Sequence, residues 1–358
     1  MSTPALAESE TRAGDGTPLL ELTDLVTGYR LRRGIGRSGG EIRAVAGVSL
    51  TVRAGETVGL VGESGCGKST IARTIVGLVR PSGGRVLFEG RDLRTLPARE
   101  MRRLRQDIQL IFQDPYASLN PRMTVAALLK EAWRIHPGLV PREQWDDEVR
   151  SLLSRVGLRP EHAGRYPHQF SGGQRQRISI ARALAVRPRL IICDEAVSAL
   201  DVSVRAQILN LLRDLQRDLG VAYLFISHDL GVVRHICDRV AVMYLGKVVE
   251  LGSKESVYRH PSHPYTQALM SAAPSLDDWR DEERHEIVLQ GDVPSPLAPP
   301  SGCRFRTRCW RAQDRCRDEE PALLDRGTGH PVACHFPEAA PSPTTAADDT
   351  DPSRPKKE

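Results

Sequence analysis

The sequence is poor in aromatic residues and contains no long apolar run. Phe, Trp and Tyr together make up 5% of its 358 residues. A membrane-spanning helix needs a run of about 18 or more apolar residues, and because none occurs we expect no span. Residues 1–16 lack the basic segment followed by an apolar segment that marks a secretory signal peptide. The expected compartment is therefore the cytosol, where thiols stay reduced.

A strong excess of charge of either sign is also missing. The chain carries 50 Lys and Arg against 45 Asp and Glu, and its net charge of +5 is mild for this length. Such a balance does not indicate a nucleic-acid partner. The apolar share of 40% is ordinary for a globular protein. The composition predicts one large domain with an extension, or two domains.

Cysteine is scarce but concentrated near the end of the chain. Four of the seven cysteines follow the spacing C-x5-C-x6-C-x17-C, namely Cys303, Cys309, Cys316 and Cys334. A reducing compartment disfavours disulfides, and the spacing differs from the close cysteine pairs of common zinc sites. Four thiolates can hold an iron–sulfur cluster. His330 and His335 lie on either side of Cys334 and are possible zinc ligands, so a zinc site is also possible. The residues alone leave a cluster, zinc and unliganded thiols as alternatives.

Short apolar runs alternate with amphipathic stretches from about residue 45 to residue 249. The runs of strand length include 57–62, 108–114, 189–195 and 221–227. Residues 202–219 form one of the helical patterns between them. This alternation predicts a mostly parallel α/β sheet. Residues 119–187 interrupt it and predict a mostly helical subdomain inserted between two strands.

The stretch GESGCGKS (62–69) matches the phosphate loop G-x-x-x-x-G-K-[ST] and lies between a predicted strand and a predicted helix. Its glycines let backbone N–H groups face a polyphosphate. Lys68 would reach the β- and γ-phosphates, and Ser69 would ligate Mg²⁺. Cys66 is either a small apolar filler or a reactive thiol, and for the second case the loop amides and Lys68 predict a lowered pKa. The predicted nucleotide contacts are Gly62, Glu63, Ser64, Gly65, Cys66, Gly67, Lys68, Ser69 and Thr70.

Two adjacent carboxylates end another apolar strand, RLIICDE (189–195). The carboxyl ends of parallel strands are where α/β folds bind ligands. Asp194 can hold Mg²⁺ through water, and Glu195 can polarise the attacking water.

The stretch FSGGQRQR (170–177) resembles the LSGGQ-type signature of the ATP-binding cassette (ABC) ATPases. The resemblance implies an α/β fold with a RecA-like core, an N-terminal antiparallel β subdomain, an inserted helical subdomain and a Cys/Pro-rich C-terminal extension. In this family the signature contacts ATP bound to the opposite protomer, so it implies a dimer of cassettes. The residues that match it are Ser171, Gly172, Gly173 and Gln174.

Three further positions match the family pattern in order, and a fourth residue is a candidate. Gln113 matches the Q-loop, which contacts Mg²⁺ and water, and Asp201 matches the D-loop at the dimer seam. His228 matches the switch histidine near the γ-phosphate. Tyr29 is the candidate for stacking on adenine, with an ordinary core tyrosine as the alternative. The resemblance thus implies ATP and Mg²⁺ as cofactors, with Lys68, Glu195 and His228 as catalytic residues and with Mg²⁺ at Ser69, Gln113 and Asp194.

Several longer stretches narrow the resemblance to the ATPase subunits of oligopeptide/dipeptide importers. These are IFQDPYASLNPRMTV, CDEAVSALDVSVRAQILNLL, HPSHPYTQAL and GDVPSPLAPPSGCRFRTRC. The first resembles the F-type member of the usual D/F pair. The last resembles the Cys-rich extension and implies a [4Fe–4S] cluster on the four cysteines, with Zn²⁺ as the alternative.

The resemblance implies an ATP-hydrolysing subunit that powers import of oligopeptides or dipeptides from the cytoplasmic face of the cell membrane. Its implied partners are a second ABC ATPase subunit, either a D-type sibling or an identical copy, two membrane permeases and, indirectly, an external peptide-binding protein. Import of nickel, opines or other small solutes is an alternative within the same subfamily. A non-transport ABC ATPase acting on nucleic acid or ribosomes is the alternative from another class.

The motifs also predict the division of the chain. The expected parts are a disordered lead at 1–18, a nucleotide-binding domain at 19–258 with its helical subdomain at about 119–187, a Cys-bearing extension at 259–337, and a disordered tail at 338–358.

Overall fold

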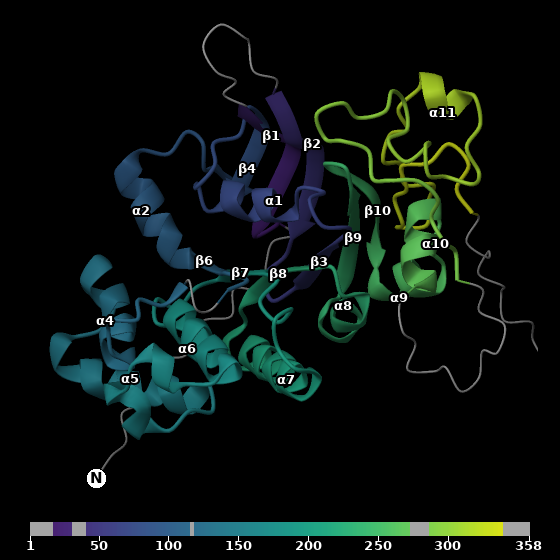
Figure 1. The fold of residues 1–358 in the computed structure, drawn as a ribbon. Helices are drawn as coiled ribbons and strands as arrows, with labels where there is room; N and C mark the ends of the chain where they lie inside the picture. Colours follow the sequence, from purple (N-terminus) through teal and green to yellow (C-terminus); the bar gives the residue numbers. More distant parts are fainter. Residues whose placement is uncertain (1–16, 31–40, 115–117, 273–285, 339–358) are drawn as a thin grey trace, which may run out of the picture.

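The computed structural model describes residues 17–30, 41–114, 118–272 and 286–338 (Figure 1). Most of the predicted lead and tail therefore lies outside the described residues. Within them, no helix is both long and apolar enough to cross a bilayer.

An antiparallel sheet begins the fold, with the strand order β2-β1-β4-β5. Its strands are β1 (Leu20–Arg30), β2 (Glu41–Val52), β4 (Gly83–Phe88) and β5 (Arg91–Asp92). This sheet is the predicted N-terminal antiparallel subdomain.

The second sheet has the order β10-β9-β3-β8-β7-β6, and only β10 pairs in antiparallel fashion. Its strands are β3 (Thr57–Val61), β6 (Ile108–Ile111), β7 (Leu190–Asp194), β8 (Ala222–Ser227), β9 (Arg239–Tyr244) and β10 (Lys247–Ser253). The predicted mostly parallel α/β sheet is confirmed.

Helices cover both faces of this sheet (Figure 1). Those that cover or border it are α1 (Lys68–Ile75), α2 (Ala98–Asp107), α6 (Gly172–Leu184), α7 (Val202–Leu219), α8 (Leu230–Ile236), α9 (Lys254–Arg259) and α10 (Pro264–Ser271). Helix α7 has the bounds that the sequence pattern predicts.

Side chains of β7 alternate between two apolar cores. Leu190 and Ile192 pack with the antiparallel sheet and α1, whereas Ile191 and Cys193 pack with the core that α6 and α7 share. All five residues of β7 are buried. Burial on both faces explains why its sequence is a continuous apolar run rather than an alternation of apolar and polar residues.

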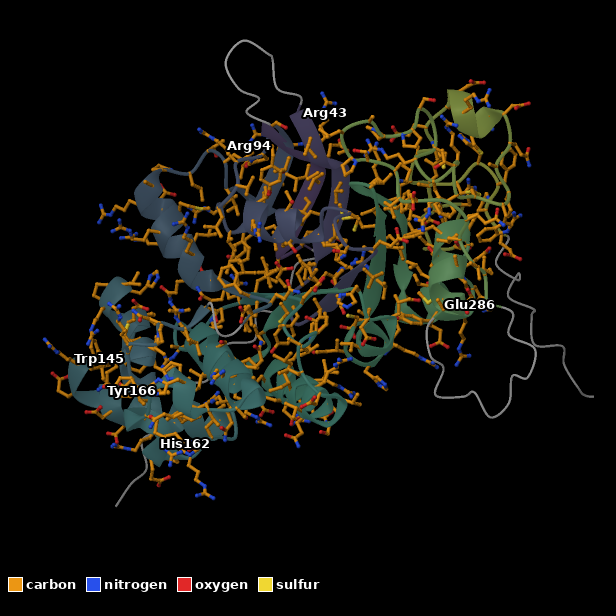
Figure 2. The ribbon with its side chains drawn as sticks, viewed as in Figure 1. Arg43, Arg94, Trp145, His162, Tyr166 and Glu286 are labelled. Atoms are coloured by element: carbon orange, nitrogen blue, oxygen red, sulfur yellow. The ribbon has the colours of Figure 1, made fainter. Side chains whose placement is uncertain are left out.

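The inserted helical subdomain projects from the parallel sheet, and Figure 2 shows its Trp145, His162 and Tyr166 far from Arg43 and Arg94 near the N-terminal sheet. It contains α4 (Val125–Ile135), α5 (Trp145–Arg155), short 3₁₀ turns and the start of α6. Trp133 is 1% exposed and donates its indole N–H to the Ala185 carbonyl at 2.8 Å.

Residues 286–338, the described Cys-bearing part of the predicted extension and called the C-terminal extension below, are mostly irregular and contain one short helix, α11 (Arg315–Asp318). The extension lies beside β10 and α10 (Figure 1), and the Leu251 and Ala333 N–H groups donate across this junction to Pro331 and Val249. Backbone hydrogen bonds therefore attach the extension to the free edge of the sheet.

A buried carboxylate joins the same parts. Glu250 in β10 is fully buried and accepts hydrogen bonds from the N–H groups of Ser262 and His263, at 2.7 and 3.0 Å. Its Oε1 also lies 2.7 Å from Nε2 of His330 in the extension. Burial lowers the pKa of His263 to about 4, so this histidine is neutral and its Nδ1 accepts the Tyr265 N–H at the start of α10.

We predict that Glu250→Ala loosens the junction, because it leaves buried N–H groups without their acceptor. Removing one member of a buried charged network costs about 3–5 kcal/mol. Hydrogen exchange at the Ser262 and His263 amides should therefore accelerate by about 100-fold or more.

The control is Glu255→Ala, which removes an exposed carboxylate paired with Arg259. Such a surface pair contributes about 0–1 kcal/mol, so exchange at the two amides should not change. Unchanged exchange in Glu250→Ala would show that Glu250 does not hold the junction.

Candidate nucleotide-binding and catalytic site

The loop 62–67 turns the chain from β3 into α1 at a point where only glycine fits. Gly62 and Gly67 have positive φ values of 151° and 111°. A Cβ atom would lie 2.1 Å from the Met243 carbonyl oxygen at the first position and 2.1 Å from the Ala44 carbonyl oxygen at the second. The glycine spacing of the motif thus follows from close backbone approach.

Lys68 begins α1 and folds back over the loop. Its side chain is buried, and Nζ donates to the carbonyl oxygens of Gly62 at 2.6 Å and Glu63 at 2.9 Å. Ser64 and Gly65 are exposed at the tip of the loop. Lys68 is therefore held at the inner side of a loop whose tip is open to solvent.

Ser69 and Asp194 meet across the edge of the sheet. The Ser69 hydroxyl donates to Oδ1 of Asp194 at 2.8 Å. Burial raises the pKa of Asp194, and this hydrogen bond opposes the rise. Asp194 is the last residue of β7, so the strand delivers its carboxylate to the start of α1.

Glu195 follows with a left-handed backbone, φ 50°. Its N–H donates to the Ile226 carbonyl at 3.0 Å, which holds it against β8. A left-handed conformation is unfavourable for a residue with a Cβ, and such strain concentrates at functional sites.

Two side chains converge on the Glu195 carboxylate, which is 14% exposed. Gln113, just after β6, donates from Nε2 to Oε2 at 2.9 Å. Nδ1 of His228, just after β8, lies 3.3 Å from Oε1. Three residues predicted from separate motifs therefore meet at one carboxylate.

Tyr29 lies close to the loop. Its hydroxyl oxygen is 3.4 Å from that of Thr70 in α1, and the residue is 37% exposed. A partly exposed ring at this position is available to a ligand above the loop.

The signature residues form a separate part of the surface. Ser171 caps α6: its hydroxyl accepts the Gln174 N–H at 3.3 Å, and the Gln174 side chain accepts the Ser171 N–H at 3.1 Å. A Cβ on Gly173 would lie 2.3 Å from Cγ1 of Val204. In the described part of the chain, Ser171 and Gln174 bond to each other rather than to the phosphate loop.

Asp201 is exposed at the start of α7, next to Val202, which is 79% exposed. An apolar side chain so open to solvent at the end of a helix leaves this point available for contact with another chain.

The prediction of a lowered pKa for Cys66 is wrong. Burial raises the pKa of this thiol, and Lys68, whose Nζ lies 3.8 Å from Sγ, opposes the rise only in part. Cys66 is 5% exposed, so it packs inside the loop as a small apolar group.

The four clustered cysteines come together as free thiols. They line one small cavity: Cys303, Cys309, Cys316 and Cys334. Burial raises the pKa of Cys303 to about 11, and the neighbouring cysteines add to the rise. The tertiary structure thus brings together thiols that are far apart in the sequence.

As placed, the four thiols leave no room for the predicted [4Fe–4S] cluster. The cavity measures about 10 Å³, which is room for about one water-sized atom rather than a cage of iron and sulfide. Over the described ranges, no three His, Cys, Asp or Glu side chains stand ready to hold a metal ion. The two histidines of the predicted zinc alternative have other neighbours. Nε2 of His330 lies beside the Glu250 carboxylate, and Nε2 of His335 lies 3.0 Å from the Glu319 carbonyl oxygen.

Two residues at the loop were missed from the sequence. Arg308 of the extension binds the Glu63 carboxylate, and the Tyr265 hydroxyl accepts the Glu63 N–H. Both lie in stretches that resemble the importer family, but nothing in those stretches indicates which part of the chain they contact.

Comparison with known proteins shows which families the chain resembles. Residues 45–198 match the ABC transporter family, and residues 249–316 match the family described as oligopeptide/dipeptide transporter, C-terminal region. The chain is 51% identical over 326 residues to the oligopeptide transport ATP-binding protein AppF of Bacillus subtilis, covering 90% of this chain and 99% of the relative. It is 51% identical over 319 residues to OppF of Salmonella typhimurium, covering 88% and 95%.

Solved cassettes have the same fold. The chain resembles cbiO1 of Clostridium perfringens, with a TM-score of 0.59 and 27% identity over 68% of this chain and 92% of that one. It also resembles a dimeric cassette bound to ADP and Pi, with a TM-score of 0.58 and 29% identity over 66% and 98%. The chain therefore belongs to the ABC transporter ATP-binding proteins, in the group that carries the oligopeptide/dipeptide transporter C-terminal region.

Proposed function

We propose that this chain is the ATP-hydrolysing subunit that powers a peptide importer, taking up oligopeptides or dipeptides. The observation that carries the catalytic part is the convergence of Gln113 and His228 on Glu195, beside the Ser69–Asp194 pair. The stretch HPSHPYTQAL, which includes the start of α10, and the Cys-rich extension support transport rather than action on nucleic acid, and the mild net charge agrees.

The nucleotide would lie over the phosphate loop. Lys68 would turn from the loop carbonyls to the β- and γ-phosphates, and Tyr29 would stack on adenine. Ser69 and Asp194 place two oxygen ligands within 2.8 Å of each other, an arrangement suited to Mg²⁺. With Gln113 they would hold the ion, whose charge would stabilise the phosphates.

Hydrolysis would use the residues grouped at Glu195. The Glu195 carboxylate would accept a proton from the attacking water as general base. Gln113 would orient that water from the other side of the carboxylate. His228, which is half-exposed, would turn toward the γ-phosphate when nucleotide is bound.

A second cassette would complete the site. The cap at Ser171 leaves the first N–H groups of α6 facing outward, where they can bind phosphate on a partner. Asp201 and Val202 would lie at the seam. The partner would be a D-type sibling or a second copy of this chain.

The membrane partners would be two permeases, and this subunit would bind them at the cytoplasmic face of the membrane. The permeases would receive substrate from an external peptide-binding protein. Phe112, beside Gln113, is 43% exposed and offers an apolar contact for them. Because a cassette does not touch the solute, import of nickel or opines would use the same residues.

The four cysteines are proposed to bind an iron–sulfur cluster, with zinc as the alternative. The support for this is that the four thiols are free and gather around one point, although the cavity between them has no room for a cluster until they move. Binding would require the thiols to lose protons and move apart, and the gain would be a covalent tie for a module with few apolar residues.

We predict that Glu195→Gln lowers ATP turnover in the assembled complex by about 10²–10⁴-fold, because the amide cannot take a proton. ATP affinity should stay close to the wild-type value, since Gln113 and His228 keep a polar neighbour. Phosphate release and nucleotide titration measure the two effects separately.

Lys68→Ala is the comparison, because it should weaken nucleotide binding itself. Turnover of Glu195→Gln within threefold of wild type would remove Glu195 from the role of base.

We predict that protein purified without oxygen contains iron and acid-labile sulfide, about four of each per chain, with visible absorption. Cys309→Ser should lose both together, whereas Cys237→Ala, in the apolar core, should keep them. If the purified protein contains zinc instead of iron and sulfide, the zinc alternative is correct. If it contains no metal at all, these cysteines do not bind a metal.

A further inference from the structure

Glu63, the second residue of the phosphate loop, is held from three directions. Its carboxylate accepts from Nη1 of Arg308 at 3.1 Å (Oε1) and 2.9 Å (Oε2), and from Nη2 at 3.1 Å. Its N–H donates to the Tyr265 hydroxyl at 2.9 Å, and its carbonyl accepts from Lys68 at 2.9 Å. Glu63 therefore connects the extension and α10 to the lysine that would bind phosphate.

The Arg308 side chain is fixed by its surroundings. It is 8% exposed, against 26% for Glu63. The Arg308 N–H donates to the Phe305 carbonyl at 3.0 Å, which closes the turn that carries it. Phe305 is 1% exposed and packs against the rings of Tyr244 and Tyr265, at 5.3 and 5.4 Å between centroids. Because packing already fixes the Arg308 side chain, forming its ion pair with Glu63 costs little side-chain entropy. A mobile surface pair would lose more.

Glu63 places a negative charge in the phosphate loop. A carboxylate in a loop that would receive a polyphosphate repels the ligand. Two like charges a few ångströms apart interact strongly where solvent is partly excluded. The guanidinium of Arg308 offsets this repulsion, and the Tyr265 hydroxyl keeps the Glu63 backbone, and with it the Lys68 acceptor, in place.

We propose that Arg308 and Tyr265 are positioning residues for ATP binding, through which the C-terminal extension and α10 neutralise and hold the phosphate loop at Glu63. The inference rests on the proposed nucleotide site and adds to it a contact from outside the cassette motifs. Through Glu63, the extension would thus affect the affinity of the phosphate loop for nucleotide.

The test is a double-mutant cycle on the full chain, with MgATP as the titrant in calorimetry. Arg308→Gln should raise the Kd on the order of tenfold, because the Glu63 charge is then uncompensated. Glu63→Gln should lower the Kd by about threefold or more, because it removes a charge of the same sign as the phosphates, and the double variant should bind more tightly than Arg308→Gln. A purely structural role for the pair predicts instead that the double variant is no better than Arg308→Gln.

Three further measurements separate charge from fold. Arg308→Lys, which keeps the charge, should bind more tightly than Arg308→Gln. Raising the salt concentration should reduce the defect of Arg308→Gln. In the assembled complex that variant should show a raised KM for ATP with kcat unchanged. Arg315→Gln, which removes an exposed cation paired with Glu319, is the matched control and should bind like wild type.

Tyr265→Phe keeps the ring and removes only the hydroxyl that accepts the Glu63 N–H, so it extends the test if Arg308→Gln does not fold. It should weaken MgATP binding by about three- to tenfold. Wild-type affinity in both Arg308→Gln and Tyr265→Phe, or no recovery in the double variant, overturns the inference. If the wild-type chain itself does not bind MgATP, or Lys68→Ala binds as well as wild type, the proposed function fails instead.

Discussion

The register of three neighbouring parallel strands is the constraint on which the candidate site depends. Val61 at the end of β3 pairs with Ser227 in β8, and Asp194 at the end of β7 pairs with Ile226. The chain therefore leaves all three strands at one edge of the sheet. The phosphate loop follows β3, the two carboxylates stand at the end of β7, and His228 follows β8. Ligand sites are expected at the carboxyl ends of parallel strands.

Burial on both faces of the sheet protects that register. A shift of one residue in β7 would exchange Ile191 and Ile192 between the two cores and move Asp194 away from Ser69. The apolar packing and the polar site thus specify the same alignment. The strained backbone at Glu195 is tolerated because β8 holds its N–H and the sheet fixes the residues before it.

The C-terminal extension is held in a different way. It has few buried apolar side chains, and its attachment uses Phe305, a short backbone pairing with β10 and the buried Glu250–His330 contact. Polar contacts of this kind depend on geometry, so the extension has a definite position relative to the cassette. That position brings Arg308 to Glu63 in the phosphate loop.

The sequence by itself determined the features that are local or periodic. The apolar strand before Asp194 and the bounds of α7 could be predicted because each depends on neighbours along the chain, and the phosphate loop at 62–69 was identified from its motif. The fold class and the family followed from these motifs. The tertiary structure alone decided what depends on residues far apart: the raised pKa of Cys66, the cavity shared by the cysteines, and the contact of Arg308 with Glu63 across 245 positions. Burial and long-range ion pairs depend on which surfaces meet in space, and no pattern along the chain records that.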